Sequence, residues 1–441
     1  MNRLKQLIVC WNQKIGSRLP IVLAASLVTG AILALVVPAL ETVLAGRYSV
    51  GFMDGYDLIA NNLAQGNGYR WTADMAETMI REPAYPLFLA GIFKIAGYHI
   101  EAARCASWLL ALGVALMMMP LTRIVTGTGN TALIASLLFL FYPGTIIAEA
   151  RGGVELPFIF AAFAFMLAVH HAVEKGGRWR YFVAGLVFGV VVQVRSTPLV
   201  FPVLLLFYLV LTANGIRERL KATLNVAILA LGMAIVMAPW VIRNYQLVHE
   251  FVPLVTNRGL ALQEGQYTCQ NLSFGGDFYP VLRESYRSRS ELASELGFRF
   301  EGAQYFQVFY NAHDEWAFTN VLIQRAEEKY VKHPGLMPAC VGKNLFNFWF
   351  LGKTWQVTKL NLLIQVPLLV LVLSGLWLLW KRGLLRKMCI MLMFVLSIFM
   401  VHLPTVAEAR YSIPVLAFLA IPASVAIVSM TSIRRKRETP A

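Results

Sequence analysis

Long apolar segments that recur along most of the chain limit its fold more than any other feature. Each segment is about 15 to 23 residues long, and about 20 apolar residues in an α-helix cross the hydrocarbon core of a bilayer. Charged residues make up only 14% of the 441 residues, whereas about 25% is usual in soluble domains. Backbone polar groups inside lipid must bond to one another, and a helix achieves this within a single segment. The sequence therefore predicts an all-α polytopic membrane protein.

We expect about ten membrane-spanning helices. They are predicted at about 20–42, 104–125, 131–148, 156–173, 181–195, 198–213, 223–242, 359–380, 388–406 and 411–431. No small-residue cleavage site follows the first segment, so we interpret it as a retained helix rather than a signal peptide. The apolar run of about 14 residues that starts at Ala84 contains Lys94 and is too short to span, which indicates an interfacial or re-entrant helix.

The distribution of positive charge predicts the topology. The net charge is +15, and the basic clusters lie at the N-terminus, in short connections between spans and in the C-terminal tail. Lys and Arg collect on the cytoplasmic side of membrane proteins. We therefore expect both termini in the cytoplasm, a location in the cytoplasmic (inner) membrane, and no nucleic-acid partner.

This topology divides the chain into three parts. They are an N-terminal transmembrane module over 1–242 that includes a first outer loop at 43–103, a large extracytoplasmic loop over 243–358, and C-terminal helices with a basic tail over 359–441. Cys269 and Cys340 both lie in the large loop. A disulfide is chemically allowed on that side, and two free thiols fit the sequence equally well.

Two carboxylates, Asp54 and Asp57, lie in the first outer loop within the stretch GFMDGYDLIANNLAQGNGYRW. At the start of a short helix such acids cap the backbone and suit the positive end of the helix dipole. A carboxylate at the membrane surface also serves as a general base for an acceptor hydroxyl or amine. The sequence leaves both roles open for both residues.

Arg81 directly precedes the sequence EPAYP, in which two prolines stiffen the start of a short helix. A fixed guanidinium suits a phosphate. The alternative is a side chain that extends along apolar surface to lipid headgroups.

Further charged residues lie where predicted spans reach the outer side. Because charges at the edge of hydrocarbon usually mark a cavity, we expect a polar outer cavity lined by Tyr56, Tyr85, Glu149, Arg151, Glu155, Arg195, Arg243, Glu408, Arg410 and Tyr411. The cysteines and histidines show no metal-ligand spacing. We therefore predict neither a metal nor any other cofactor.

Several short motifs occur in an order that resembles a known family. They are YDLIANNLAQGNGY, REPAYPLFLA, GGVELPFIF, AGLVFGVVVQVRSTPLVFP, PWVIRN and ARYSIPVLAFLAI. Together they are similar to the GT-C fold glycosyltransferases of family 39, in particular the protein O-mannosyltransferases and the aminoarabinose lipid A transferases, over about residues 20–430.

The resemblance implies a role for two residues. It makes the acid of the first outer loop, Asp54, the catalytic base, and it makes Arg81 the ligand of the donor phosphate. Asp54 lies two residues before Tyr56, whereas relatives place the acid three or four residues before the tyrosine. The choice between Asp54 and Asp57 therefore stays open.

The function that this implies is an inverting transfer of a hexose or pentose from a polyprenyl-phosphate donor, on the outer side of the membrane. The acceptor is a lipid, a glycan or a protein, and Arg243 and Arg410 are expected beside Arg81 at the donor phosphate. A multi-pass transporter or lipid flippase without transfer chemistry is the alternative. Transporter sites lie near the middle of the bilayer, whereas the charges here gather at one face.

Overall fold

The computed structural model describes residues 18–44, 55–303 and 306–438, with only the backbone described at 36–44 and 432–438. Asp54 lies outside these residues. Almost every element in the described part of the chain is a helix, which confirms the predicted fold class.

The expected spans coincide with helices. These helices are α2 (Leu19–Leu44), α5 (Ile100–Thr126), α6 (Gly129–Leu140) with α7 (Pro143–Arg151), α8 (Glu155–Lys175), α9 (Arg178–Val194), η1 (Thr197–Val200) with α10 (Phe201–Thr212), α11 (Ile216–Val248), α16 (Trp355–Lys381), α17 (Leu385–His402) and α18 (Ile413–Glu438). Six of the described helices are long and apolar enough to cross a membrane alone, and α6 with α7, which meet at a bend of 52°, form a seventh candidate. The other expected spans coincide with α2, α9 and η1–α10.

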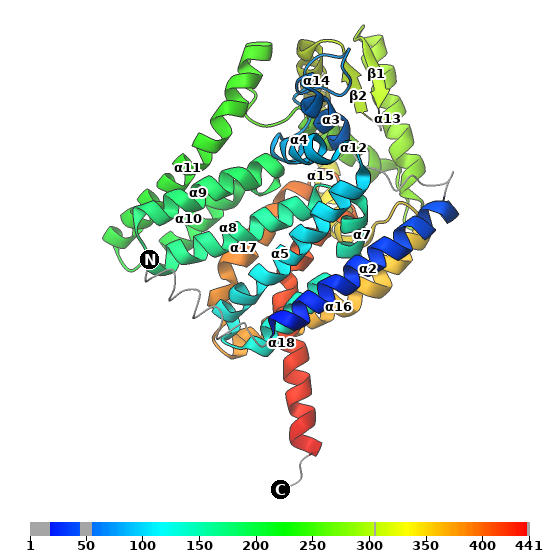
Figure 1. The fold of residues 1–441 in the computed structure, drawn as a ribbon. Coiled ribbons are helices and arrows are strands. Elements are labelled where there is room, and N and C mark those ends of the chain that lie inside the picture. Colours follow the sequence, from blue (N-terminus) through cyan, green and yellow to red (C-terminus); the bar gives the residue numbers. More distant parts are fainter. Residues whose placement is uncertain (1–17, 45–54, 304–305, 439–441) are drawn as a thin grey trace.

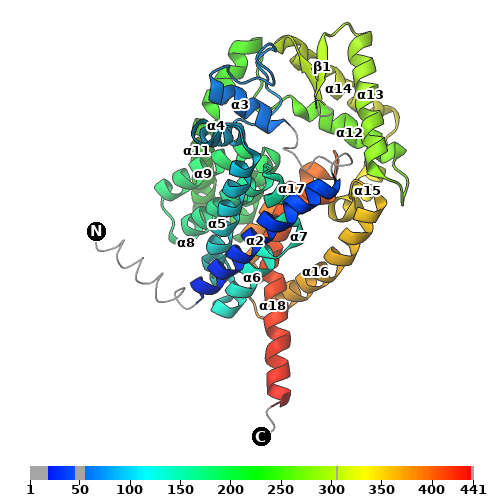
Figure 2. The ribbon, with the colours of Figure 1, turned by 45° about the vertical axis from the view of Figure 1, so that its right-hand side comes forward.

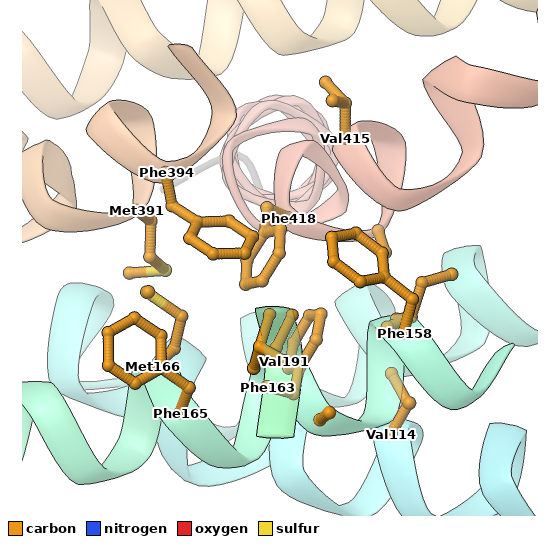
Figure 3. Close-up of a cluster of buried hydrophobic side chains, with 14 of the residues drawn as sticks. Val114, Phe158, Phe163, Phe165, Met166, Val191, Met391, Phe394, Val415 and Phe418 are labelled. Carbon is orange, nitrogen blue, oxygen red and sulfur yellow. The ribbon is translucent and has the colours of Figure 1, made fainter. Parts of the chain in front are cut away.

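An aromatic core holds these helices together. The rings of Phe163 on α8 and Phe418 on α18 stack with centroids 4.4 Å apart, and Phe394 on α17 packs edge-on against Phe418 at 5.5 Å. Figure 3 shows these side chains pointing toward one another from separate helices. Because lipid offers no hydrophobic force between helices, such close packing supplies much of their association.

Small residues allow α9 and α11 to approach each other closely. A Cβ added to Gly185 would lie 2.0 Å from the backbone oxygen of Leu229, and one added to Gly232 would lie 2.5 Å from that of Phe182. Any larger residue at either position would push the two helices apart. The backbones of the two helices are therefore in direct contact at these glycines.

The connecting elements gather at one end of the molecule, which we call the loop end (Figures 1 and 2). Its elements are α3 (Tyr56–Gln65), α4 (Ala84–Ala96), α12 (Asn257–Asn271), α13 (Phe278–Glu295), β1 (Phe300–Ala303), β2 (Phe306–Phe309), α14 (Ala312–Lys332), α15 (Leu336–Phe350) and η2 (Ala409–Ser412). The last turns of α18 project from the opposite end (Figure 1). The short helix expected from Ala84 is α4, whereas the antiparallel hairpin that pairs Phe300 with Phe309 was not anticipated.

The two long loops share one hydrophobic core instead of forming two units. Trp71 and Ile80 of the first loop pack with Phe309, Phe318 and Leu322 of the second. A disulfide between Cys269 and Cys340 joins α12 to α15 and settles the alternative that the sequence left open. The residues of the second loop are therefore fixed relative to those of the first.

Candidate active site at the loop end

The first turn of α3 is placed by a glycine. Gly55 has a φ of 75°, in the left-handed region, and a Cβ at this position would lie 1.7 Å from the Trp71 ring. Only glycine fits such a position without moving the indole. Tyr56 and Asp57 follow directly, so both side chains take their direction from this turn.

Asp57 is buried, with 5% of its surface exposed. Its Oδ2 accepts a hydrogen bond of 2.7 Å from the Tyr98 hydroxyl. Its Oδ1 has no hydrogen-bond partner among the described residues. Burial raises the pKa of Asp57, and the bond from Tyr98 opposes that rise. A carboxylate with a raised pKa and an open oxygen has the properties of a general base.

Arg81 lies buried between two aromatic rings. Its guanidinium carbon is 4.9 Å from the centroid of Tyr56 and 4.3 Å from that of Phe306, which belongs to β2. The Tyr69 hydroxyl donates a bond of 3.0 Å to the backbone oxygen of Arg81 and fixes the chain there. The two ring faces hold the guanidinium plane in one orientation, and a fixed guanidinium is the geometry that binds phosphate.

A second group of cations surrounds Tyr411. The guanidinium carbons of Arg195 and Arg410 lie 4.8 Å and 5.0 Å from its ring centroid, and the His402 ring stacks on it at 4.3 Å. Glu408 forms ion pairs with Arg410 at 2.5 Å and with Lys353 at 3.1 Å. Arg195, Arg410 and Lys353 thus share this group with two carboxylates, Glu408 and the neighbouring Glu264. The excess of one positive charge suits an anion.

The Arg81 and Tyr411 groups are joined through neighbouring residues. The backbone N–H and the hydroxyl of Ser196 donate bonds of 2.9 Å and 2.7 Å to Glu82. Ser196 follows Arg195, and Glu82 follows Arg81. The structure therefore brings the loop-one residues, the end of α9 and η2 together at one site.

Tyr85 links this site to α7 and α8. Its ring packs edge-on against Tyr56 with centroids 5.2 Å apart, and its hydroxyl donates to the backbone oxygen of Gly152. Burial, and then the nearby charges of Glu155 and Asp57, raise the pKa of Tyr85. Glu155 therefore lies near Tyr85 and Asp57.

Glu149 and Arg151 both lie on α7. Glu149 is fully buried, and neither carboxylate oxygen has a hydrogen-bond partner in the described part of the chain. Arg151 is the last residue of α7 and is partly exposed.

Arg243 contacts the segment before Arg81. Its Nη1 donates to the Thr78 oxygen at 2.8 Å, and its Nη2 forms an ion pair with Glu77 at 3.3 Å. Its guanidinium also packs over Trp240 at 4.7 Å. The side chain thus holds residues 77 and 78 in place.

Sequence reasoning missed Tyr98, Phe306, Lys353 and His402. Tyr98 follows α4 and contacts Asp57, 41 positions earlier in the chain, so no local sequence pattern indicates this contact. Phe306 and Lys353 come from the second loop, where only the charge of Lys353 was a signal.

Within the described ranges, no three His, Cys, Asp or Glu residues lie together as metal ligands.

Comparisons with known proteins give a family match over part of the chain and a similar fold. Residues 81–242 match the model of the dolichyl-phosphate-mannose-protein mannosyltransferases. The chain is similar to the oligosaccharyltransferase of Archaeoglobus fulgidus, solved with a tethered acceptor peptide that contains the NVT sequon, at a TM-score of 0.51 and 13% identity. The match covers 95% of this chain and 50% of that one, so the chain spans half the length of this neighbour.

ArnT from Cupriavidus metallidurans, solved with undecaprenyl phosphate, matches at a TM-score of 0.38 and 14% identity, over 94% of this chain and 78% of that one. No curated protein sequence matches the chain significantly. The chain is thus a GT-C fold membrane protein similar to the glycosyltransferases of family 39, which confirms the resemblance found in its sequence.

Proposed function

We propose that the chain transfers a monosaccharide from a polyprenyl-phosphate donor to a lipid, glycan or protein acceptor, with inversion, on the outer side of the cytoplasmic membrane. One observation carries this proposal: the Arg81 guanidinium is buried at the loop end against the Tyr56 ring, and the two loop-one carboxylates, Asp54 and the buried Asp57, lie within two residues of Tyr56 in the sequence. A base and a fixed phosphate ligand are the two groups that such a transfer needs.

The reaction is a single displacement. A loop-one carboxylate removes the acceptor proton, the acceptor attacks the anomeric carbon, and the bond from that carbon to the phosphate oxygen breaks. The resemblance assigns the base to Asp54, and Asp57, which binds Tyr98, steadies the start of α3. The lipid phosphate leaves with its negative charge, which Arg81 and the Tyr411 group stabilise.

The acceptor binds at the opposite face of the sugar from the lipid phosphate, as inversion requires. The peptide in the archaeal neighbour belongs to that enzyme, and the acceptor class here follows from the family alone.

The disulfide supports the proposed side of the membrane. Disulfides form in oxidising compartments and are rare in the cytosol. The pair Cys269–Cys340 lies at the loop end together with Asp57 and Arg81. The proposal therefore places the disulfide, Asp57 and Arg81 on the outer side of the membrane.

The test uses purified protein and a panel of polyprenyl-phosphate monosaccharides, with release of the lipid phosphate as the readout. Release that needs an acceptor and is lost in Arg81→Ala supports the proposal. Transport of the intact lipid across a vesicle membrane without release would establish the flippase alternative instead.

A further inference from the structure

An aromatic cluster lies where the second loop meets the start of α16. Phe274, in the turn between α12 and α13, packs against Phe346 with ring centroids 5.6 Å apart and against Trp355 at 5.4 Å. Phe350 completes the cluster, at 5.1 Å from Phe346. Phe274 nevertheless keeps 83% of its surface exposed. An exposed ring within a group of four aromatic side chains is a candidate interaction surface.

The turn that carries Phe274 is fixed to the start of α16. The backbone N–H of Trp355 donates a bond of 2.7 Å to the carboxylate of Asp277. The backbone N–H of Tyr279 donates a bond of 3.0 Å to the backbone oxygen of Lys353. Because both ends of these bonds belong to short connections, Phe274 lies at the same height along the membrane normal as the first residue of α16.

Two lysines locate the bilayer along α16, which is a candidate span. Lys359 and Lys381 are both exposed, and no charged residue lies between them. Their separation of 22 residues corresponds to about 33 Å of helix, and the hydrocarbon core of a bilayer is about 30 Å thick. Lysines that flank such a segment extend their amines to the headgroups. Trp355 lies about one turn outside Lys359, so the aromatic cluster is placed in the headgroup layer, where Trp is enriched.

An apolar stripe on α16 joins the aromatic cluster to the hydrocarbon. Val366, Leu373 and Trp377 are exposed. They follow Trp355 by 11, 18 and 22 residues, and each of these spacings is close to a whole number of helical turns. The lipid-facing side of the span therefore continues directly into the aromatic cluster.

We propose that the turn at 273–276 is a membrane anchor, and that Phe274 inserts into the headgroup layer at the loop end. The partner of the aromatic cluster is thus lipid, and transfer of the exposed ring out of water drives the contact. The disulfide between Cys269 and Cys340 joins α12, which precedes the turn, to α15, which carries Phe346. The anchor is therefore tied to the body of the second loop and holds that loop down on the bilayer.

The experiment measures the depth of the turn with a fluorescent label on the full-length chain. Cys10, Cys105 and Cys389 are replaced by serine, and one cysteine is introduced at the exposed Ser273, which leaves Phe274 in place. The cysteine carries an NBD group, and the protein is reconstituted in phosphatidylcholine nanodiscs with and without lipids brominated near the top of the acyl chains. Size-exclusion elution and circular dichroism confirm that each variant is folded.

Two further label positions calibrate the result. Leu363→Cys, at a position 72% exposed on α16, reports direct contact with lipid. Leu296→Cys is the matched control, because Leu296 is also an exposed apolar residue but caps the far end of α13, about 27 Å from Phe278 at its start. Figure 2 shows α13 extending away from α15 and α16.

We expect brominated lipid to quench the label at Ser273→Cys nearly as strongly as at Leu363→Cys, and to leave the label at Leu296→Cys unquenched. Addition of Phe274→Asp should reduce quenching at Ser273→Cys to the level of Leu296→Cys, because an ionised carboxylate stays in water. Quenching at Ser273→Cys no stronger than at Leu296→Cys overturns the anchor. Quenching that persists with Phe274→Asp overturns it as well, since lipid contact would not depend on the ring. A blue-shifted but unquenched label at Ser273→Cys would place a second copy of the chain on the aromatic cluster instead of lipid.

Discussion

The backbone amide of Met79, which lies two residues before Arg81, donates a hydrogen bond of 2.9 Å to the carboxylate of Glu315. The same carboxylate accepts bonds from the hydroxyls of Thr78, at 2.6 Å, and of Thr256. Glu315 is 6% exposed and lies on α14, in the second loop. The position of Arg81 on the first loop therefore depends on a residue more than 230 positions away.

Glu315→Ala is expected to destabilise the loop end. It leaves three buried donors without their acceptor, and each such group costs about 1 to 3 kcal/mol. Thermal unfolding in detergent should show a large loss for this variant and a smaller one for Glu315→Gln, which keeps one carbonyl acceptor. In Glu315→Gln the Michaelis constant for the donor should rise more than turnover falls, since Arg81 shifts. Equal unfolding of both variants and wild type would contradict this role.

Arg81→Ala is expected to weaken donor binding by roughly 1.5 to 3 kcal/mol, the range for hydrogen bonds to charged groups. Water cannot reproduce a planar two-bond contact to phosphate in a partly dry site. Direct binding of a polyprenyl-phosphate sugar measures the loss. Arg325→Ala, at an exposed basic position on α14, is the control. Unchanged affinity in Arg81→Ala would show that the guanidinium serves only to hold the rings together.

Asp54→Asn is expected to lower turnover by about 10² or more, the low end for loss of a general base, while donor binding persists. Asn still caps a helix but accepts no proton at neutral pH. Asp57→Asn should be much milder, since an amide oxygen still accepts the Tyr98 hydrogen bond. Single-turnover rates compare the two variants. The reverse order would exchange their roles, and normal rates in both would move the search for the base to Glu149, Glu155 or Glu408.

Asp57 is also expected to lower stability at neutral pH. Burial raises its pKa in the folded protein above the ordinary 3.8. At pH values between 3.8 and the raised pKa, the folded state binds more protons than the unfolded state. The free energy of unfolding therefore falls as the pH rises through this range and stays low above it. Asp57→Asn should therefore raise the melting temperature at pH 7 and not near pH 3. A melting difference that does not change with pH would show that the carboxyl is not perturbed.

Labelling of introduced cysteines tests the topology. We expect a membrane-impermeant maleimide, added outside, to label Glu284→Cys on α13 and not Arg178→Cys at the start of α9; both positions are exposed. Replacement of the free Cys105 and Cys389 by serine removes the described background. Labelling of Arg178→Cys alone would invert the orientation and place the proposed site in the cytoplasm.

The membrane helices could be predicted from the sequence because hydropathy is a local property. The short apolar run that contains Lys94 was enough to predict a helix too short to span, and this helix is α4. The hairpin that carries Phe306 was missed, since four-residue strands leave no periodic signal.

The sequence predicted site residues only where charge marks them. Charges at span ends predicted Arg195 and Arg410, because a charge at the edge of hydrocarbon is costly and usually marks a cavity. Arg81 was predicted from its place before a helix stiffened by proline, and the roles of all three stay predictions. Which partner each one takes was not predictable. The ion pair of Arg243 with Glu77 joins residues 166 positions apart, and only the folded chain brings such residues together.

The bond between Cys269 and Cys340 closes a ring of chain with a sequence separation of 71 residues. The turn at Gly297 and the hairpin lie inside this ring. A protease that cuts at that turn would open the ring without releasing a fragment, because both pieces stay joined through sulfur. The covering of Arg81 by Phe306 is thus secured against a single break in the backbone at this turn.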